Sequence, residues 1–313
     1  MAIYITGGSG YIGNHLVHAL SQHAEELIVI DNNSGKNQYS RKNKVKYIDI
    51  SLHQSGAREI LVHEFLKTKN NCVVHLAGLK SVENSERNPD LYTHINLNAT
   101  INLLSAMEQG SVDKFIFSST AAVYGDNIRL ADETSLTNPI SQYGKVKLKE
   151  EELIKKAGLN SLSSYAILRF FNVIGAQSAS MRELSGGNIF PQLTRAIERR
   201  ETFRIFGNSY PTLDGTCVRD YVDVRDLVIA ISKTINLLNH GPVGVLNLGS
   251  GIETSVLQLV KKVMDVKSFN YEIAPARNGD ISTLISDVTK AKSVLNWIPN
   301  YSIEDSVNSV FRP

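Results

Sequence analysis

A tyrosine and a lysine four residues apart, Tyr143 and Lys147, carry the clearest chemical potential in this sequence. Residues at this spacing share one face of a helix, so the phenol and the ammonium can lie side by side. Lowering a phenol pKa from about 10 to about 7 takes roughly 4 kcal/mol. Because a nearby positive charge favours the phenolate, the pair predicts a general base. The spacing alone is also typical of an ordinary helix surface.

A run of small and polar residues further upstream supplies part of the missing context. Residues 118–125 read Ser-Ser-Thr-Ala-Ala-Val-Tyr-Gly and continue an apolar, strand-like segment at 114–118. The carboxyl ends of parallel strands face the ligand crevice of such a sheet. Thr120 is therefore expected near Tyr143, where its hydroxyl would orient a reacting hydroxyl group.

The start of the chain supplies the rest. Residues 2–6 have the pattern of a strand, the run Gly-Gly-Ser-Gly-Tyr-Ile-Gly follows at 7–13, and a helical pattern begins there. Glycines at such a turn let the backbone approach a pyrophosphate, and the helix N terminus offers free N–H groups to it. The sequence thus predicts a dinucleotide-binding turn.

Acidic residues follow the next two strand candidates. The apolar segment 27–30 ends in Asp31, where a carboxylate would bind the adenosine ribose and repel a 2′-phosphate. This favours NAD over NADP. Asp49 and Ile50 end the third candidate, where the adenine ring would lie, although the same pair is equally typical of an ordinary strand end.

These residues need a scaffold, and the first half of the chain predicts one. Short apolar segments at 2–6, 27–30, 45–48, 72–75, 114–118 and 164–168 alternate with helical patterns at 11–21, 57–67, 89–109 and 142–157. That alternation predicts an α/β fold with a Rossmann-type, doubly wound parallel sheet. We expect this NAD-binding domain at 1–171 and a smaller mixed α/β substrate domain at 172–313, with 218–231 returning to the first domain.

Composition excludes several other classes of protein. The chain has 313 residues and a net charge of +2, which argues against a nucleic-acid partner. Only two cysteines are present, and no segment approaches the roughly 20 apolar residues of a membrane span. The eight histidines have no metal-ligand spacing, so we expect no metal. These features, with no leader before the first strand, favour a cytoplasmic protein with no membrane contact.

At this point the sequence resembles the extended short-chain dehydrogenase/reductase superfamily, and within it the UDP-glucose (UDP-galactose) 4-epimerase branch. The likeness extends from about residue 2 to residue 297. Beyond the motifs above, it rests on His-Leu-Ala-Gly-Leu-Lys-Ser-Val at 75–82, Arg-Phe-Phe-Asn-Val-Ile-Gly-Ala at 169–176 and the most specific run, Phe-Gly-Asn-Ser-Tyr-Pro-Thr-Leu-Asp-Gly-Thr-Cys-Val-Arg-Asp-Tyr at 206–221.

The resemblance implies an NAD-dependent, reversible C4 epimerisation of a UDP-hexose, in which Thr120, Tyr143 and Lys147 form the catalytic set. It implies that NAD is held by Gly7, Gly10, Tyr11, Ile12, Gly13, Asp31, Asn32, Asp49, Ile50, Leu76, Ala77, Gly78, Lys80, Asn96, Ser118, Tyr143, Lys147 and Phe171. It implies that the UDP-sugar is held by Lys80, Ser118, Thr120, Tyr143, Asn172, Asn188, Ile189, Phe206, Arg219, Arg277, Asp280 and Leu284. It also implies a homodimer built on helices 89–109 and 142–157, although apolar residues on several sides also suit helices buried within one chain.

Three departures from the family pattern qualify this reading. The loop after Asp31 is short, so ribose contacts from 32 to 36 are open. Phe170 replaces a family-typical tyrosine, which would change packing only. Leu284 stands where, by the resemblance, a large tyrosine restricts the pocket to plain hexoses and smaller residues admit 2-acetamido sugars. Leucine is intermediate, so UDP-GlcNAc and UDP-GalNAc are possible substrates.

Other activities remain as alternatives. A nucleotide-sugar 4,6-dehydratase needs an acid–base pair directly after the strand-end Thr, but Ala121 and Ala122 stand there. A glucuronate epimerase or decarboxylase would need extra cations near the sugar carboxylate, which sequence does not exclude. A catalytically silent NAD-binding protein is disfavoured because Thr120, Tyr143 and Lys147 are all present.

Overall fold

The computed structural model describes residues 1–35, 44–126, 128–159, 162–184, 186–277 and 279–312. Its largest element is a seven-stranded sheet in the order β11-β7-β5-β4-β1-β2-β3, with every neighbouring pair parallel. The strands are β1 (Ala2–Thr6), β2 (Glu26–Asp31), β3 (Lys46–Asp49), β4 (Cys72–His75), β5 (Lys114–Thr120), β7 (Ser164–Phe170) and β11 (Gly244–Leu248). The predicted Rossmann-type fold is confirmed.

Helices cover both faces of this sheet, which is why its strands are apolar on both sides. The helices of this part are α1 (Tyr11–Leu20), α2 (Ala57–Phe65), α3 (Val82–Arg87), α4 (Pro89–Tyr92), α5 (Asn98–Gln109), α6 (Gln142–Gly158) and α8 (Val224–Leu237). One buried cluster joins the sheet to α1 and α8, and a second joins the opposite face to α2, α5 and α6. The helix predicted at 89–109 is present as α4, a π-helical turn at Thr93–Leu97 and α5 in succession.

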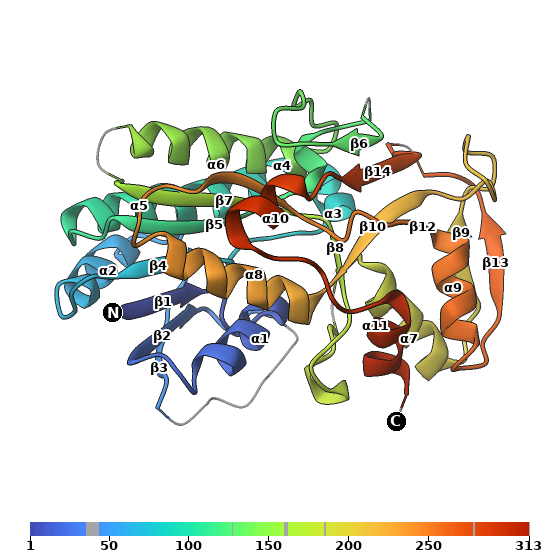
Figure 1. The fold of residues 1–313 in the computed structure, drawn as a ribbon, viewed down its shortest axis with the longest axis horizontal. Helices are drawn as coiled ribbons and strands as arrows, with labels where there is room; N and C mark the ends of the chain where they lie inside the picture. The colour runs from blue at the N-terminus through green and yellow to red at the C-terminus, as the bar shows by residue number, and fades with distance from the viewer. Residues whose placement is uncertain (36–43, 127, 160–161, 185, 278, 313) are drawn as a thin grey trace.

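A second unit lies beside the carboxyl ends of these strands, on the right of Figure 1. Its larger sheet has the order β12-β10-β14-β6, with β8 paired to β10, and a separate sheet pairs β13 with β9. The strands are β6 (Leu130–Ala131), β8 (Asn172–Ile174), β9 (Phe203–Phe206), β10 (Val218–Asp223), β12 (Glu253–Ser255), β13 (Tyr271–Ala274) and β14 (Thr283–Ser286). Its helices are α7 (Ile189–Arg199), α9 (Val256–Met264) and α11 (Ile303–Phe311), which share a buried cluster; α10 (Thr289–Leu295) packs on the large sheet instead.

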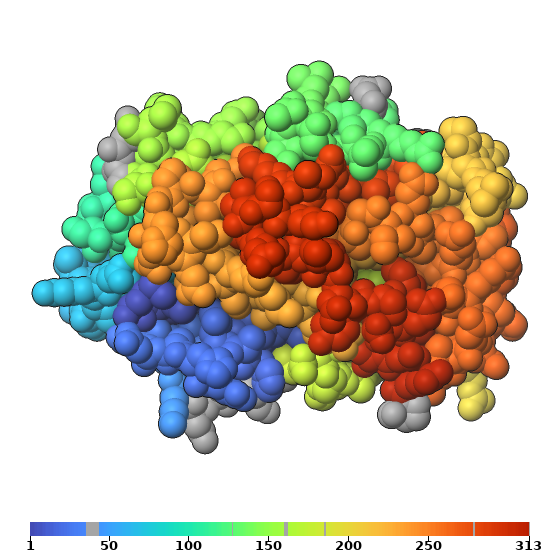
Figure 2. Space-filling model, in the orientation of Figure 1, coloured from blue at the N-terminus to red at the C-terminus, as the bar shows by residue number. Residues whose placement is uncertain are grey.

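The chain passes between the two units more than once. β10 belongs to the larger sheet of the second unit, while α8, which follows it directly, packs against α1 of the first unit. β11 then adds the seventh strand to the large sheet, from a part of the chain where no strand of that sheet was expected. Figure 2 shows the C-terminal segments, in red, lying across the middle of this face between the two units. The domain boundaries themselves remain a prediction.

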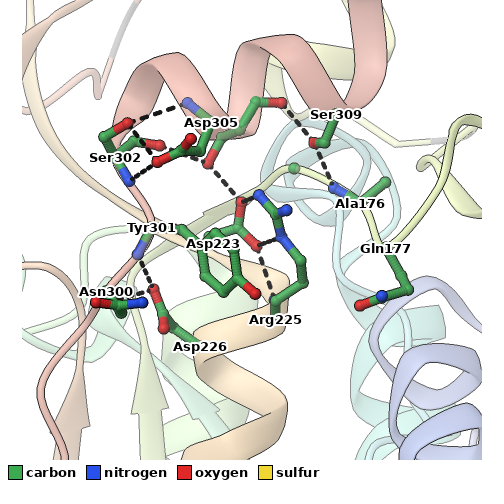
Figure 3. Close-up of polar contacts among 12 residues, drawn as sticks. Ala176, Gln177, Asp223, Arg225, Asp226, Asn300, Tyr301, Ser302, Asp305 and Ser309 are labelled. Carbon is green, nitrogen blue, oxygen red and sulfur yellow. Dashed lines mark hydrogen bonds and ion pairs between the residues drawn. The ribbon is translucent and has the colours of Figure 1, made fainter.

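A polar junction fixes α8 to the C-terminal segment (Figure 3). Asp223 caps the N terminus of α8 by accepting a hydrogen bond from Arg225 N at 2.8 Å, and it accepts another from Ser306 Oγ at 2.6 Å. Asp226 accepts from the backbone N–H groups of Asn300 and Tyr301, both at 2.9 Å. Because Asp223 and Asp226 are buried, these bonds hold the second unit in a defined position against the first.

Candidate active site

A cavity of about 1440 Å³ lies between the two units and over the carboxyl ends of β1, β4 and β5. Pockets for single drug-sized ligands have about 300–1,000 Å³, so this one has room for more than one such molecule. Of the residues predicted to hold ligands, those that line it are Gly7, Gly10, Tyr11, Ile12, Gly13, Asp31, Asn32, Ile50, Leu76, Ala77, Gly78, Lys80, Ser118, Thr120, Tyr143, Lys147, Phe171, Asn172, Asn188, Ile189, Phe206, Arg219, Arg277, Asp280 and Leu284.

Two predicted contact residues do not line the cavity. Asn96 is fully buried, and its amide accepts from Leu79 N at 2.8 Å and donates to Leu79 O at 2.9 Å. It therefore supports the backbone of the loop after β4 rather than presenting its side chain to a ligand. Asp49 accepts a hydrogen bond from Asn33 Nδ2 at 2.9 Å beside the cavity. Of the loop at 32–43, residues 36–43 lie outside the described residues.

The glycine run forms a tight turn between β1 and α1. Gly7 has a φ of +70°, and a Cβ there would lie 2.6 Å from Ala77 N. A Cβ on Gly13 would lie 2.2 Å from Gly7 O, so a side chain would push α1 away from β1. Gly10 begins α1 without a side-chain cap, which leaves N–H groups at the helix start for an anion.

Asp31 closes the turn from the end of β2. Its carboxylate accepts from Ser9 N at 2.9 Å and from Asn33 N at 2.7 Å, and it lines the same cavity. The turn thus combines N–H donors for phosphates with a carboxylate for ribose hydroxyls. These donors and acceptors suit a dinucleotide with an unmodified ribose.

The catalytic set predicted from sequence comes together where β5 meets α6. Ser141 caps α6 by accepting from Gly144 N at 3.1 Å, and a Cβ on Gly144 would lie 2.6 Å from Ala122 O. This close approach brings the first turn of α6 against the segment after β5, so that Tyr143 and Thr120 share a hydrogen bond.

Burial and one carboxylate dominate the electrostatics at Tyr143 in the chain without cofactor. Burial is the largest influence and raises the pKa of its phenol; the negative charge of Glu150 raises it further, and the hydrogen bond from Thr120 opposes both. The Nζ of Lys147 faces Glu150 Oε2 at 3.4 Å and lies 4.3 Å from the centre of the Phe117 ring. The expectation that Lys147 and a positive nicotinamide ring together favour the phenolate stays a prediction for the site with NAD bound.

The second unit contributes cationic and polar groups to the opposite wall. Arg219, on β10, donates to Val218 O at 2.9 Å. Arg277 pairs with Asp280 at 3.1 Å and stacks its guanidinium 4.4 Å from the centre of the Phe206 ring. Guanidinium groups so placed suit the bidentate binding of a diphosphate.

Two acidic residues at the site were missed in the sequence. Glu183 is almost fully buried; it forms an ion pair with Lys80 and accepts from Asn188 Nδ2 at 3.0 Å, so it joins two predicted ligand-binding residues. It lies in an irregular polar segment that gives no periodic signal. Glu150 faces Lys147, and its position seven residues after Tyr143 on the same helix was a readable signal.

Neither a metal-ligand cluster nor a membrane-spanning helix occurs in the described ranges. There, no three His, Cys, Asp or Glu side chains gather where they could hold a metal ion. No helix among those residues combines the length and the apolar character needed to cross a membrane.

Comparison with known proteins decides the family. Residues 3–249 match the NAD dependent epimerase/dehydratase family. The chain belongs to this family. A UDP-glucose 4-epimerase of Bacillus subtilis is 37% identical to it, over 97% of this chain and 94% of the relative. Its predicted family, epimerase class and NAD dependence are thereby confirmed.

Solved structures of family members share the whole fold. The UDP-glucose-4-epimerase of Stenotrophomonas maltophila, with bound NAD and formylated UDP-arabinopyranose, superposes with a TM-score of 0.92 at 29% identity and covers 100% of this chain and 97% of that one. The UDP-Glc/GlcNAc 4-epimerase of Campylobacter jejuni gives 0.84 at 33% identity, over 99% of this chain and 98% of that one. In this chain, the glycine turn and Asp31 fit the NAD on which the family depends.

Proposed function

We propose that this protein interconverts UDP-hexoses by reversible epimerisation at C4, with UDP-glucose and UDP-galactose as its principal pair. The observation that carries the proposal is the hydrogen-bonded Thr120–Tyr143 pair, with Lys147 one helical turn further on, beside a dinucleotide turn in one cavity. Its curated relatives are named UDP-glucose 4-epimerases, which supports the same substrate class.

The reacting groups have distinct roles. NAD, held by the glycine turn and Asp31, would supply both the acceptor for the C4 hydride and its return, which inverts the carbon when the 4-keto sugar presents its other face. Tyr143, as phenolate, takes the proton of the C4 hydroxyl and later gives it back. Thr120 orients that hydroxyl group. The ammonium of Lys147 lies on the same face of α6 as Tyr143. The overall reaction involves no net oxidation or reduction, because the sugar regains both the hydride and the proton.

Binding of the UDP portion falls to the second unit. Arg219 and Arg277 would hold the diphosphate, and Asp280 the uridine ribose. Asn172, whose amide donates to Asp220 O at 3.1 Å, and Asn188 would bind the substrate from neighbouring loops. The arginines would bind the nucleotide and leave the hexose free to present either face to the hydride acceptor.

The sugar pocket supports a wider substrate range. Leu284 is buried in a small cluster with Tyr124 and Phe171 and borders the cavity. We propose that this leucine leaves space for a 2-acetamido group, so that UDP-GlcNAc and UDP-GalNAc are also interconverted. The Campylobacter jejuni relative, described as a UDP-Glc/GlcNAc 4-epimerase, supports this extension.

A second candidate is epimerisation of UDP-glucuronic acid. MoeE5, solved in complex with that compound and NAD, superposes with a TM-score of 0.87 at 27% identity.

Three further expectations also stay proposals. They are the homodimer, the cytoplasmic location, and the division into domains at 1–171 and 172–313 with 218–231 returning to the first. A role in galactose metabolism and one in cell-surface polysaccharide synthesis stay proposals as well.

The deciding experiment incubates the purified protein with UDP-galactose, UDP-GlcNAc or UDP-glucuronic acid, without added nicotinamide cofactor, and separates the epimers by chromatography. We expect UDP-glucose from UDP-galactose, and none from Tyr143→Phe although NAD remains bound. Ordinary turnover by Tyr143→Phe contradicts the assigned base. Bound NAD with no conversion of any sugar nucleotide indicates a binding protein instead.

A further inference from the structure

Glu150 lies at the centre of a buried polar chain behind the catalytic set. Its side chain is fully buried, one carboxylate oxygen accepts from Thr100 Oγ1 at 2.6 Å, and the other faces Lys147 Nζ at 3.4 Å. That second oxygen has no hydrogen-bond partner among the described residues. Tyr143, Lys147 and Glu150 stand at i, i+4 and i+7 of α6, so all three share one helix face.

This series of buried hydrogen bonds continues from Thr100 through the sheet to the loop that borders the cavity. His75 Nε2 lies 3.2 Å from Thr100 Oγ1, and His75 Nδ1 lies 2.6 Å from Thr6 Oγ1. Thr6 Oγ1 in turn accepts from Ala77 N at 3.3 Å. All of the side chains in this path are fully buried, and burial, aided by the charge of Lys147, lowers the pKa of His75 to about 3.

These contacts fix the direction of every hydrogen bond. A neutral imidazole has one donor and one acceptor nitrogen. Because the Thr100 hydroxyl donates to Glu150, it must accept from Nε2–H of His75, and Nδ1 must then accept from Thr6. The chain thus points all its donors toward Glu150, which is the arrangement that stabilises a carboxylate next to Lys147.

We propose, on the basis of the epimerase function above, that Glu150 is a positioning residue that holds the Lys147 ammonium and offsets its charge beside Tyr143. With its charge balanced by Glu150, Lys147 presents little net positive charge to the phenol. Ionisation of Tyr143 then depends on the positive charge that the oxidised cofactor brings to the cavity. A base tuned in this way is active only when a hydride acceptor is in place.

The other groups around this pair do not supply the same effect. Tyr143 also faces Thr120 on β5 and Tyr92 on α4. Glu150 faces Thr100 on α5, which in turn shares a hydrogen bond with the neutral His75 on β4. Lys147 contacts the uncharged ring of Phe117. Among the described groups that influence the pKa of Tyr143, Glu150 is the one that carries a formal charge.

The test measures the ionisation of Tyr143 directly, in the holoenzyme with its NAD. Carbon-13 NMR of ζ-labelled tyrosine follows one resonance through a pH titration, and Tyr143→Phe identifies it by its loss. We expect Glu150→Gln to lower the Tyr143 midpoint by about one pH unit, in the range that one nearby charge produces. The acidic limb of kcat for UDP-galactose should move by the same amount.

Glu152→Gln is the matched control. Glu152 is exposed on the same helix, and the substitution removes the same charge. It should leave both readouts unchanged. Glu150→Asp retains the charge and should keep the midpoint near that of the wild type while lowering kcat. Should Glu150→Gln fail to fold, Glu150→Leu removes the charge with an apolar side chain and is expected to give the same shift.

A midpoint in the charge-removing variant equal to that of Glu152→Gln overturns the proposal, even where activity falls. Because the titration uses no sugar nucleotide, the two proposals can fail separately. A shifted midpoint in a protein that epimerises no UDP-sugar refutes the proposed function alone. An unshifted midpoint in an active epimerase refutes the role of Glu150 alone.

Discussion

The ion pair between Glu151 and Arg169 gives the sharpest test of how the strand end below the catalytic threonine is held. Arg169, on β7, donates to Glu151 through Nε at 2.9 Å and through Nη2 at 2.7 Å. Ser119, adjacent to Thr120, donates to the same carboxylate at 2.6 Å. Both charged side chains are almost fully buried, and these bonds outweigh burial and lower the pKa of Glu151.

The substitution Glu151→Gln leaves the Arg169 charge buried and uncompensated. Breaking a buried pair from one side costs about 3–5 kcal/mol, and a chain of this size loses roughly 2 °C of Tm per kcal/mol. We therefore expect Tm to fall by about 6–10 °C. The double substitution Glu151→Leu with Arg169→Met removes both charges and should recover most of that loss.

The assay is thermal unfolding followed by circular dichroism at several pH values, with Glu152→Gln as the exposed control. A carboxyl group with a lowered folded pKa stabilises the protein above its unfolded pKa of about 4.5, and this contribution disappears as pH falls through the folded value. The Tm difference between wild type and Glu151→Gln should therefore be full at neutral pH and shrink in acid. A neutral-pH loss no larger than that of Glu152→Gln would refute the reasoning.

Three further predictions concern ligand binding. Gly13→Ala should release most NAD on gel filtration, since the new Cβ would lie 2.2 Å from Gly7 O; retention of one NAD per chain contradicts this. Arg219→Met should raise KM for UDP-galactose about 10- to 100-fold, through loss of roughly 1.5–3 kcal/mol of charge-assisted bonding, whereas Arg129→Met, which removes an exposed guanidinium paired with Glu253, should not. Leu284→Tyr should lower kcat/KM for UDP-GlcNAc by about 10-fold or more relative to UDP-glucose; equal losses for both would show that Leu284 does not select the sugar.

Local patterns explain why much of this site was readable from sequence. The glycine turn needs only neighbouring residues to adopt its conformation, and the four-residue spacing of Tyr143 and Lys147 fixes their shared helix face. The carboxyl-end position of Thr120 follows from the parallel sheet. Each of these features depends on contacts close in sequence or on one rule of sheet topology. The alternation of strands and helices in the sequence was therefore sufficient to predict them.

The features that were missed depend on contacts between distant segments. β11 pairs with β7 across more than seventy residues of sequence, and its five residues have no signal that distinguishes a central strand from one of the second unit. Asn96 reaches Leu79 instead of the cavity, and Lys80 pairs with Glu183 from another unit.

Two successive glutamates on α6 show how such distant contacts divide one residue type between two tasks. Glu151 turns toward Arg169 and Ser119, where bidentate bonding matches its charge and the pair braces β5 against β7. Glu150, one position earlier and about 100° around the helix, turns toward Lys147 with one oxygen left without a hydrogen bond among the described residues. Removing the Glu151 charge should therefore lower Tm and leave the Tyr143 midpoint in place, whereas removing the Glu150 charge should move that midpoint. If both substitutions moved the midpoint equally, the phenol would be responding to the net charge of α6 rather than to the carboxylate beside Lys147.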